Sequence, residues 1–217
     1  MTDRREVAGV VLAGGLARRM GGGDKPLRPI AGRAMLDRVV ARLAPQVGAL
    51  ALNANGDPAR FAEFDLPVIP DPVGGYAGPL AGVLAGLEWA RDAVSGAAWV
   101  ASAAGDTPFF PADLVDRFMD AAGGDHGTIC LARTHGHVHP VFGLWPVALA
   151  ADLRAFLEKG ETRKVLAFVD AWRRVDVDFD PIDGADSPFD PFFNVNAPED
   201  IDTAEAMAAA LEGEAVG

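Results

Sequence analysis

The stretch "VAGVVLAGGLARRMGGGDK", residues 7–25, decides the predicted fold. Its first residues, Val7–Ala13, are apolar throughout, as expected of a strand that is buried on both faces of a sheet. The chain then enters a loop in which glycines alternate with Arg18, Arg19 and Lys25. A buried strand that ends in a flexible, basic loop is typical of α/β proteins that bind an anion beyond the strand.

The glycines of this loop would leave backbone N–H groups uncovered, and successive N–H groups form a concave nest for an anion. Lys25 and the arginines would add full charges suited to a polyphosphate. The loop is not a Walker A loop, because Asp24 precedes the lysine and Pro26 follows it, and its glycine spacing does not fit GxGxxG. A flexible surface loop without a ligand is the alternative.

Strand-like stretches alternate with helical patterns along the rest of the chain. The expected strands are Val7–Ala13, Ala49–Asn53, Val68–Ile69, Ala98–Ala103, Gly127–Ala132, Val138–Trp145 and Arg174–Asp178. The expected helices are Ala34–Leu43, Leu80–Val94, Ala112–Ala121, Val147–Leu157, Thr162–Phe168 and Pro198–Leu211. This alternation predicts an α/β three-layer sandwich with helices on both faces of a mostly parallel sheet. The segment "RTHGHVH" predicts a hairpin turn, so the sheet is expected to be mixed.

Composition narrows the class of protein. The chain has 217 residues, half of them hydrophobic, and we expect a single domain over residues 1–217. No apolar stretch approaches the roughly 20 residues that span a bilayer, and the amino end lacks a secretory layout. Cys130 is the only cysteine, which excludes an internal disulfide. We therefore expect a cytoplasmic monomer that does not bind membranes.

Charge is unevenly distributed. The net charge of −12 argues against nucleic-acid binding. Residues 1–42 nevertheless hold nine basic against four acidic residues, so a local anionic ligand is expected there. Arg33, Arg38 and Arg42 are expected on a solvated helix face. The alanine-rich end, residues 204–217, is expected to fray.

Polar residues follow the predicted strands, where ligands bind in open α/β sheets. Asn53 and Asn55 follow the second strand, Asp71 the third and Asp106 the fourth. Asp106 could hold Mg²⁺ together with substrate phosphates, or it could cap a helix or close a turn. Asp71 could accept hydrogen bonds from N1–H and the N2 amine of guanine, or it could form an Asx turn.

Three further features of the sequence could mark a ligand site. Gly78 and Pro79 begin a predicted helix whose small residues let a sugar or base approach the backbone. His135, His137 and His139 could suggest zinc, but in an extended strand the outer pair would lie ~13 Å apart. The acidic segment at residues 176–190 lacks the spacing of an EF-hand loop and is expected to be solvated.

Taken together, these residues resemble the molybdenum cofactor guanylyltransferases, within the Rossmann-like nucleotidyltransferases. The matching elements are "LAGGLARRMGG-DK" (Leu12–Lys25), "NAN" (Asn53–Asn55), "DP…GPLAG" (Asp71, Gly78–Gly82), "DTP" (Asp106–Pro108), "HP" (His139–Pro140) and "NVNAPED" (Asn194–Asp200). The resemblance covers nearly the whole chain. Ala17 departs from it, since related enzymes often carry a serine there.

The resemblance implies transfer of GMP from GTP to molybdopterin, with release of pyrophosphate. It implies GTP binding by Leu12, Ala13, Gly14, Gly15, Gly22, Lys25, Asn53, Asp71, Gly78 and Asp106. It gives Lys25, Asp106 and Arg19 the catalytic roles and Asp106 the Mg²⁺ ion. Asn194, Asn196 and His139 are expected on the molybdopterin side. The GTP-binding half would span about residues 1–110 and the molybdopterin-binding half about residues 111–205.

Three other functions stay open from the sequence. They are CMP transfer to the same acceptor, nucleotidyl transfer to a sugar phosphate, and nucleotide binding without catalysis, as in a delivery partner for molybdoenzymes. Gly14 favours guanine, because the resembling cytidylyltransferases carry "LAAG" at the place of "LAGG" and a glycine leaves room for a purine. Further partners would be molybdoenzymes, their chaperones or other proteins of cofactor biosynthesis.

Overall fold

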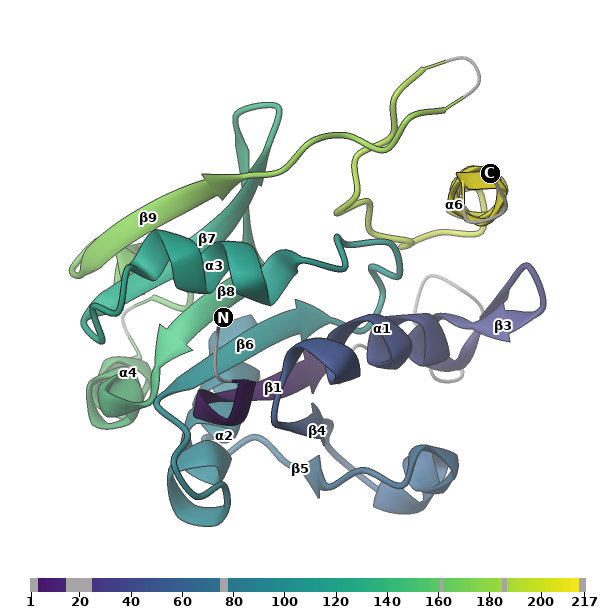
Figure 1. Ribbon diagram of the computed structural model, residues 1–217. Helices are drawn as coiled ribbons and strands as arrows, with labels where there is room; N and C mark the ends of the chain where they lie inside the picture. The colour runs from purple at the N-terminus through teal and green to yellow at the C-terminus, as the bar shows by residue number, and fades with distance from the viewer. Residues whose placement is uncertain (1–3, 15–24, 75–77, 161, 185–186, 215–217) are drawn as a thin grey trace.

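A computed structural model describes residues 4–14, 25–74, 78–160, 162–184 and 187–214 of the chain (Figure 1). Its centre is a seven-stranded sheet in the order β5-β4-β1-β6-β8-β7-β9. The strands are β1 (Val7–Leu12), β4 (Ala49–Asn53), β5 (Val68–Ile69), β6 (Trp99–Ala104), β7 (Thr128–Thr134), β8 (His137–Pro146) and β9 (Arg173–Asp178). In this sheet β8 pairs antiparallel with both of its neighbours, and the other pairs are parallel.

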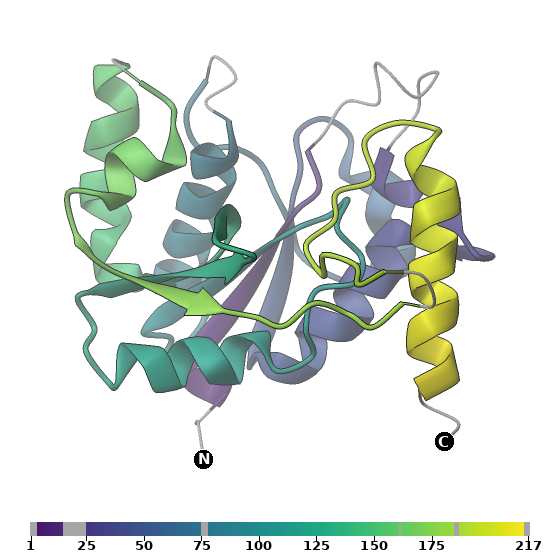
Figure 2. The same cartoon turned by 90° about the horizontal axis from the view of Figure 1, so that it is seen from above.

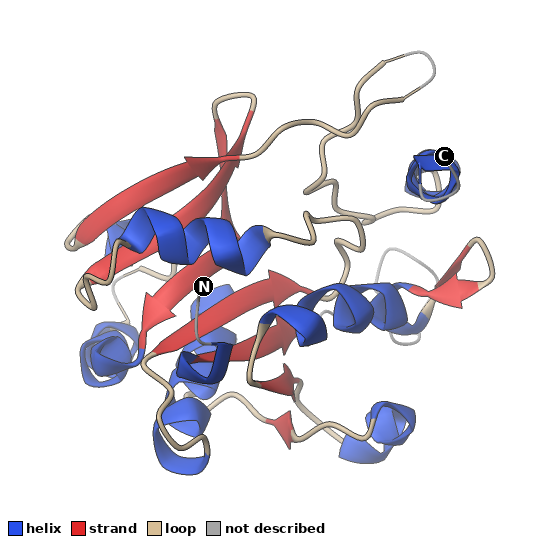
Figure 3. Cartoon of the chain, in the orientation of Figure 1, coloured by secondary structure: helices blue, strands red, loops and turns tan. Residues whose placement is uncertain are grey.

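Helices cover both faces of the sheet (Figure 2). They are α1 (Met35–Leu43), α2 (Pro79–Ala93), α3 (Leu114–Ala122), α4 (Ala150–Lys159), α5 (Val165–Val169) and α6 (Asp200–Glu214). Short 3-10 helices connect them: η1 (Arg4–Glu6), η2 (Lys25–Leu27), η3 (Ala44–Gln46), η4 (Pro58–Phe64) and η5 (Val147–Leu149). Figure 3 shows the alternation of strands and helices that defines the α/β class.

Alternate residues of β1 supply two separate cores. Val7 and Val11 pack with α1 and α3, whereas Ala8 and Val10 pack with α2 and α4. Each strand residue points to the face opposite its neighbour, so a strand covered on both sides must be apolar throughout. The predicted three-layer sandwich with a mixed, mostly parallel sheet is confirmed.

All seven predicted strands and all six predicted helices are present, with ends shifted by a few residues. The predicted hairpin joins β7 to β8 through His135 and Gly136, which have φ of 51° and 77°. A small hairpin of β2 (Pro29–Ile30) and β3 (Arg33–Ala34) is present in addition to the predicted elements. Strands of two residues are too short to show a periodic pattern.

Two expectations from the sequence are wrong, one about the alanine-rich end of the chain and one about the arginines of α1. Residues 200–214 form α6, and Ala204, Met207 and Ala208 are buried in a third cluster with Ile30 and Met35, so this part does not fray. Apolar side chains at this helical spacing dock the helix.

Arg38 and Arg42 are half-buried rather than solvated. They donate hydrogen bonds to the carbonyl oxygens of Ile30 and Phe110. Burial, followed by the charge of Arg38, lowers the pKa of Arg42. Arg33 is exposed, as expected. Among the described residues, no helix is long and apolar enough to cross a bilayer.

Candidate active site

The carboxyl ends of β1, β4 and β6 lie side by side at one edge of the sheet. Leu12 is in register with Asn53 of β4 and with Ala104 of β6. The backbone N–H of Ala13 donates to the carbonyl of Asn53 at 2.9 Å, and that of Gly105 donates to the carbonyl of Leu12 at 3.0 Å. Gly14 then leaves the sheet and is exposed. The predicted site residues Gly15, Arg19 and Gly22 lie outside the described residues.

Lys25 is the centre of a polar cluster. Its side chain is only 8% exposed, and its Nζ lies 2.5 Å from Oδ2 of Asp106. The same ammonium group donates to Oδ1 of Asn196 at 2.5 Å and to Oδ1 of Asn194 at 3.3 Å. A buried ammonium group is costly unless it is paired and hydrogen-bonded, and these three oxygens supply both. Predicted site residues from three distant segments therefore meet.

The loop that carries Asn194 and Asn196 is held from two sides. Asn194 and Asn196 are exposed while Val195 between them is buried, the alternation of extended backbone. Val195 N–H donates to the carbonyl of Asp106 at 3.0 Å. The carboxylate of Asp200 accepts hydrogen bonds from the N–H groups of Asn196 at 2.6 Å and Ala197 at 2.8 Å. The two amide side chains are thereby fixed beside Asp106.

The oxygens around Lys25 fit a hard cation. One carboxylate and two amide oxygens converge on the ammonium group, and oxygen ligands of this kind suit Mg²⁺. The reading of Asp106 as a helix cap is wrong, because the next helix, α3, begins at Leu114 after Asp113. Asp106 does lie in a turn, closed by Thr107 N–H on the carbonyl of Ala104, and its side chain reaches Lys25.

A second polar cluster surrounds Asp71. Oδ1 of Asp71 accepts a hydrogen bond from Nδ2 of Asn53 at 3.0 Å, and Oδ2 accepts one from Nδ2 of Asn55 at 2.8 Å. Asn53 is buried and also donates to the carbonyl of Ile69 at 3.2 Å. Within the part of the chain that the structure describes, each oxygen accepts from one side-chain amide, which leaves lone pairs for a ligand.

Relatives of known name match nearly the whole chain. Residues 9–175 match the family described as "MobA-like NTP transferase domain". A protein of Rhodopseudomonas palustris named molybdenum cofactor guanylyltransferase is 54% identical over 96% of this chain and 97% of its own length. A protein of the same name from a Bradyrhizobium species is 52% identical over 94% of this chain and 93% of its own. The chain belongs to the molybdenum cofactor guanylyltransferases.

The fold of this guanylyltransferase chain has solved counterparts. A crystal structure described as molybdopterin-guanine dinucleotide biosynthesis protein A from Archaeoglobus fulgidus superposes with a TM-score of 0.68. That match covers 93% of this chain and 98% of the other at 20% sequence identity. At that level of identity the likeness concerns the fold, and it agrees with the Rossmann-like nucleotidyltransferase architecture expected from the sequence.

The start of α2 lies against the Asp71 cluster of the guanylyltransferase. Gly78 precedes α2 with φ 71° and ψ −164°, a conformation that a side chain would disfavour, and Pro79 takes the first helical position. A Cβ at Gly82, in the first turn, would lie 2.3 Å from Oδ1 of Asn53 and 2.6 Å from Cδ2 of Leu12. The small residues of "GPLAG" therefore let the helix approach these two predicted GTP-binding residues.

His139 packs against the segment that leads to Asn194. Its ring stacks on Phe192 with centroids 4.7 Å apart, and its Nε2 lies 3.6 Å from Oδ2 of Asp190. Burial lowers the pKa of His139, the charge of Asp190 opposes this, and His137 adds to the lowering. Phe192 lies two residues before Asn194. His135 and His137 are exposed, and the described residues contain no group of three or more His, Cys, Asp or Glu side chains that could hold a metal ion.

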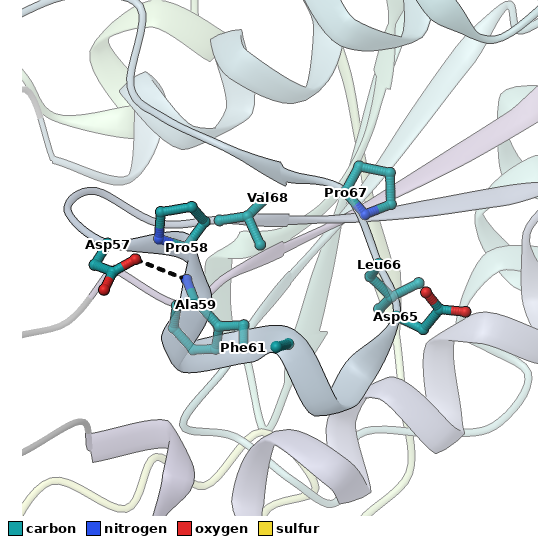
Figure 4. Close-up of a pocket in the computed structure, with 9 residues that line it drawn as sticks. Asp57, Pro58, Ala59, Phe61, Asp65, Leu66, Pro67 and Val68 are labelled. Atoms are coloured by element: carbon teal, nitrogen blue, oxygen red, sulfur yellow. Dashed lines mark hydrogen bonds between the residues drawn. The ribbon is translucent and has the colours of Figure 1, made fainter.

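A hollow of about 640 Å³ lies between η4 and β5 (Figure 4). Its lining residues fall between Asp57 and Val68 and combine apolar side chains such as Phe61 with the carboxylates of Asp57 and Asp65. In Figure 4 the Asp57 carboxylate accepts a hydrogen bond from the N–H of Ala59, at 2.9 Å, so it serves the start of η4. The two polar clusters are the candidate active site, because the side chains of several predicted site residues converge there.

The structure also brings in two residues that the sequence analysis quoted without a role. Asn55 holds Asp71, and Asp200 holds the loop of Asn194 and Asn196. Both stand in motifs of the resemblance, "NAN" and "NVNAPED". Their roles could not be read from the sequence, because each acts on another residue rather than on a ligand.

Proposed function

We propose that this chain transfers GMP from GTP to the terminal phosphate of molybdopterin, forming a guanine dinucleotide and releasing pyrophosphate. The observation that carries the proposal is the meeting of Lys25 with Asp106, Asn194 and Asn196 at the carboxyl edge of the sheet. A buried cation and a cluster of oxygens at this edge suit a polyphosphate and its metal.

The first half of the chain would bind GTP. Leu12, Ala13 and Gly14 lead into the glycine loop, where Gly15, Gly22 and Arg19 would complete the phosphate site with Lys25. Asn53 and Asp71 would bind the base, with the Asp71 carboxylate accepting from N1–H and the N2 amine of guanine. Adenine presents an acceptor at N1, which a carboxylate repels. Gly78 would let the nucleoside approach the backbone.

The metal would be Mg²⁺ held by Asp106, with substrate phosphates as further ligands. When bound, the ion offsets negative charge on the phosphate oxygens during transfer. Asn194 and Asn196 lie close enough to Asp106 to orient the reacting phosphates. Lys25 lies where it can exchange its contact with Asp106 for one with a phosphate oxygen.

In the reaction, an oxygen of the acceptor phosphate attacks the α-phosphorus of GTP. The bond between the α-phosphorus and the oxygen that bridges it to the β-phosphorus breaks, and pyrophosphate leaves with that oxygen. The nucleophile is already an anion, so the protein needs no strong general base. Its contribution is alignment of the two phosphates and neutralisation of charge on pyrophosphate by Lys25 and Arg19.

The acceptor would lie on the side formed by residues 111–205. Asn194, Asn196 and His139 come from this half, and the exposed amides face the Lys25 cluster. A GTP-consuming reaction fits the cytoplasm. That the protein acts as a monomer and passes its product to molybdoenzymes stays a prediction.

Incubation of the protein with Mg-GTP and molybdopterin tests the proposal directly. We expect the guanine dinucleotide and an equal amount of pyrophosphate. CTP in place of GTP should give little product, and a sugar phosphate in place of molybdopterin should give none. Preference for CTP would indicate a cytidylyltransferase, and GTP binding without turnover would indicate a binding module.

A further inference from the structure

Asn55 and Asp71 close the base of a long excursion of the chain. Residues 56–67 leave the sheet after β4, form η4 and return in β5. At the base, the N–H of Asp71 donates to Oδ1 of Asn55 at 2.9 Å, and Nδ2 of Asn55 donates to Oδ2 of Asp71 at 2.8 Å. One side-chain amide thus fixes both the backbone and the carboxylate of Asp71.

Arg60, a residue of this excursion, holds the backbone of Asn55 in place. Nη2 of Arg60 donates to the carbonyl of Asn55 at 2.7 Å, and Nε of Arg60 donates to the carbonyl of Asp57 at 3.0 Å. The guanidinium also lies over the Phe61 ring, 4.9 Å from its centroid. The side chain of Asn55 therefore starts from an anchored backbone, although the residue is exposed.

The two oxygens of Asp71 consequently have matching environments. Each receives one amide hydrogen, Oδ1 from Asn53 and Oδ2 from Asn55. A carboxylate has about four acceptor positions, so roughly one remains on each oxygen. The two donors also prevent rotation of the carboxylate about its Cβ–Cγ bond. The acceptor positions of a carboxylate lie in its own plane, so a fixed plane directs the two that remain in one direction, as two adjacent donors of a planar base require.

We infer that Asn55 is a positioning residue for guanine selectivity, acting by holding Oδ2 of Asp71. The inference rests on the proposed role of Asp71 in binding the base. Asn55 need not touch the nucleotide. An arginine in its place would occupy both oxygens as a bidentate partner, whereas one neutral amide leaves acceptor capacity for the base.

Inosine triphosphate is the probe that isolates this role. It keeps the N1–H of guanine and lacks the N2 amine, so it tests whether both oxygens of Asp71 are in position. Loss of a hydrogen bond to a charged group changes affinity by about tenfold or more. The wild-type protein should therefore bind GTP at least about tenfold more tightly than inosine triphosphate.

The experiment compares Asn55→Ala, Asn55→Asp and Asp71→Ala, with Asp57→Ala as matched control. Asp57 caps η4 in the same excursion and its carboxylate accepts from Ala59. Affinities for GTP and inosine triphosphate are measured with Mg²⁺ by competition against a fluorescent GTP analogue. Melting temperatures are recorded for each variant. Asn55→Asp keeps the size of the side chain and the acceptor for Asp71 N–H, so it serves if Asn55→Ala does not fold.

Both Asn55 variants should lower the GTP preference to about twofold or less, and Asp57→Ala should keep it. In turnover assays KM for GTP should rise in the Asn55 variants while kcat stays near wild type, because the base lies away from the reacting phosphates. An unchanged preference in both Asn55 variants, with loss of preference in Asp71→Ala, overturns the inference alone. An unchanged preference in Asp71→Ala overturns the proposed role of Asp71 and the inference with it.

Discussion

The ammonium of Lys25 lies 2.5 Å from Oδ2 of Asp106, although 81 residues separate the two in the sequence. Asp106 is also the residue proposed to hold the metal. The lysine and a metal ion would therefore compete for the same carboxylate oxygen. Because of this competition, the effect of Lys25 on metal binding can be measured separately from its effect on catalysis.

Substitution of Lys25 by methionine should strengthen metal binding in solutions without nucleotide. The ammonium no longer competes for Asp106, so the affinity for Mn²⁺, a paramagnetic substitute for Mg²⁺, should rise about tenfold. Electron paramagnetic resonance of free Mn²⁺ measures this. A lower affinity in Lys25→Met would show that the lysine does not compete with the metal.

Substitution of Asp106 or Lys25 by alanine should abolish most GMP transfer while the protein stays folded. Removal of a charged group aimed at the reacting phosphates costs about 10²–10³-fold in kcat. The measurement is formation of pyrophosphate and dinucleotide, with circular dichroism to confirm folding. Near-normal transfer by either variant would contradict the role proposed for that residue.

Asp200→Ala should slow transfer without a direct contact to substrate. The substitution removes the acceptor for the N–H groups of Asn196 and Ala197, so the asparagines lose their fixed position beside Asp106. We expect a fall in kcat of about tenfold, equivalent to the loss of about one hydrogen bond. Asp202→Ala is the matched control on the exposed face of α6. Equal kcat values for the two variants would refute the positioning role.

Gly82→Ala should weaken GTP binding as well as stability. The new Cβ would lie 2.3 Å from Oδ1 of Asn53, so helix or asparagine must move. We expect a loss of about 1–3 kcal/mol in the free energy of unfolding and a higher KM for GTP.

Gly86→Ala is the control for Gly82→Ala, since its Cβ would lie 2.8 Å from Val10 in the core. It should lower stability similarly and leave KM near wild type. Equal KM changes in the two variants would assign the effect to helix packing alone.

His139 should make the protein less stable in mild acid. Because burial lowers its pKa below the ordinary 6.5, the unfolded chain binds the proton more readily than the native protein. The contribution of His139 to stability is therefore complete above about pH 6.5 and is lost as the pH falls toward the lowered native pKa.

Melting temperatures measured between about pH 7 and pH 5, the range in which histidine titrates, check this prediction. The decline toward low pH should be smaller in His139→Gln than in wild type. His135→Asn is the control, because His135 is exposed and asparagine tolerates its φ of 51°. A decline in His139→Gln as steep as in wild type would show that His139 does not carry the effect.

Much of the fold could be predicted from local patterns. The apolar run Val7–Ala13 required a strand covered on both faces, and β1 packs into two cores. The short β2–β3 hairpin and the docking of α6 were not predicted. A strand of two residues is too short to show a periodic pattern. The sequence of α6 does not indicate which distant side chains will cover its apolar residues, and in the structure Ile30 and Met35 do so.

Some features of the candidate site could likewise be predicted from the sequence, and others could not. Asn53, Asp71 and Asp106 could be selected from the sequence because each follows a predicted strand, and β1, β4 and β6 do end at one edge. The hydrogen-bond partners of these side chains could not be predicted from the sequence. Arg42 was assigned to solvent because its helix position looked exposed, and only the packed structure shows its carbonyl partner, Phe110.

By itself, the sequence determined the seven strands of the main sheet, its six helices, the turn between β7 and β8, and several of the polar residues that follow the strands. These follow from side-chain periodicity and backbone preference, which act over a few residues. The tertiary structure alone decided that Lys25 meets Asn196, 171 residues away, and that Asn55 turns back to hold Asp71. Hydrogen bonds depend on distance in space, and the folding of the whole sheet sets that distance.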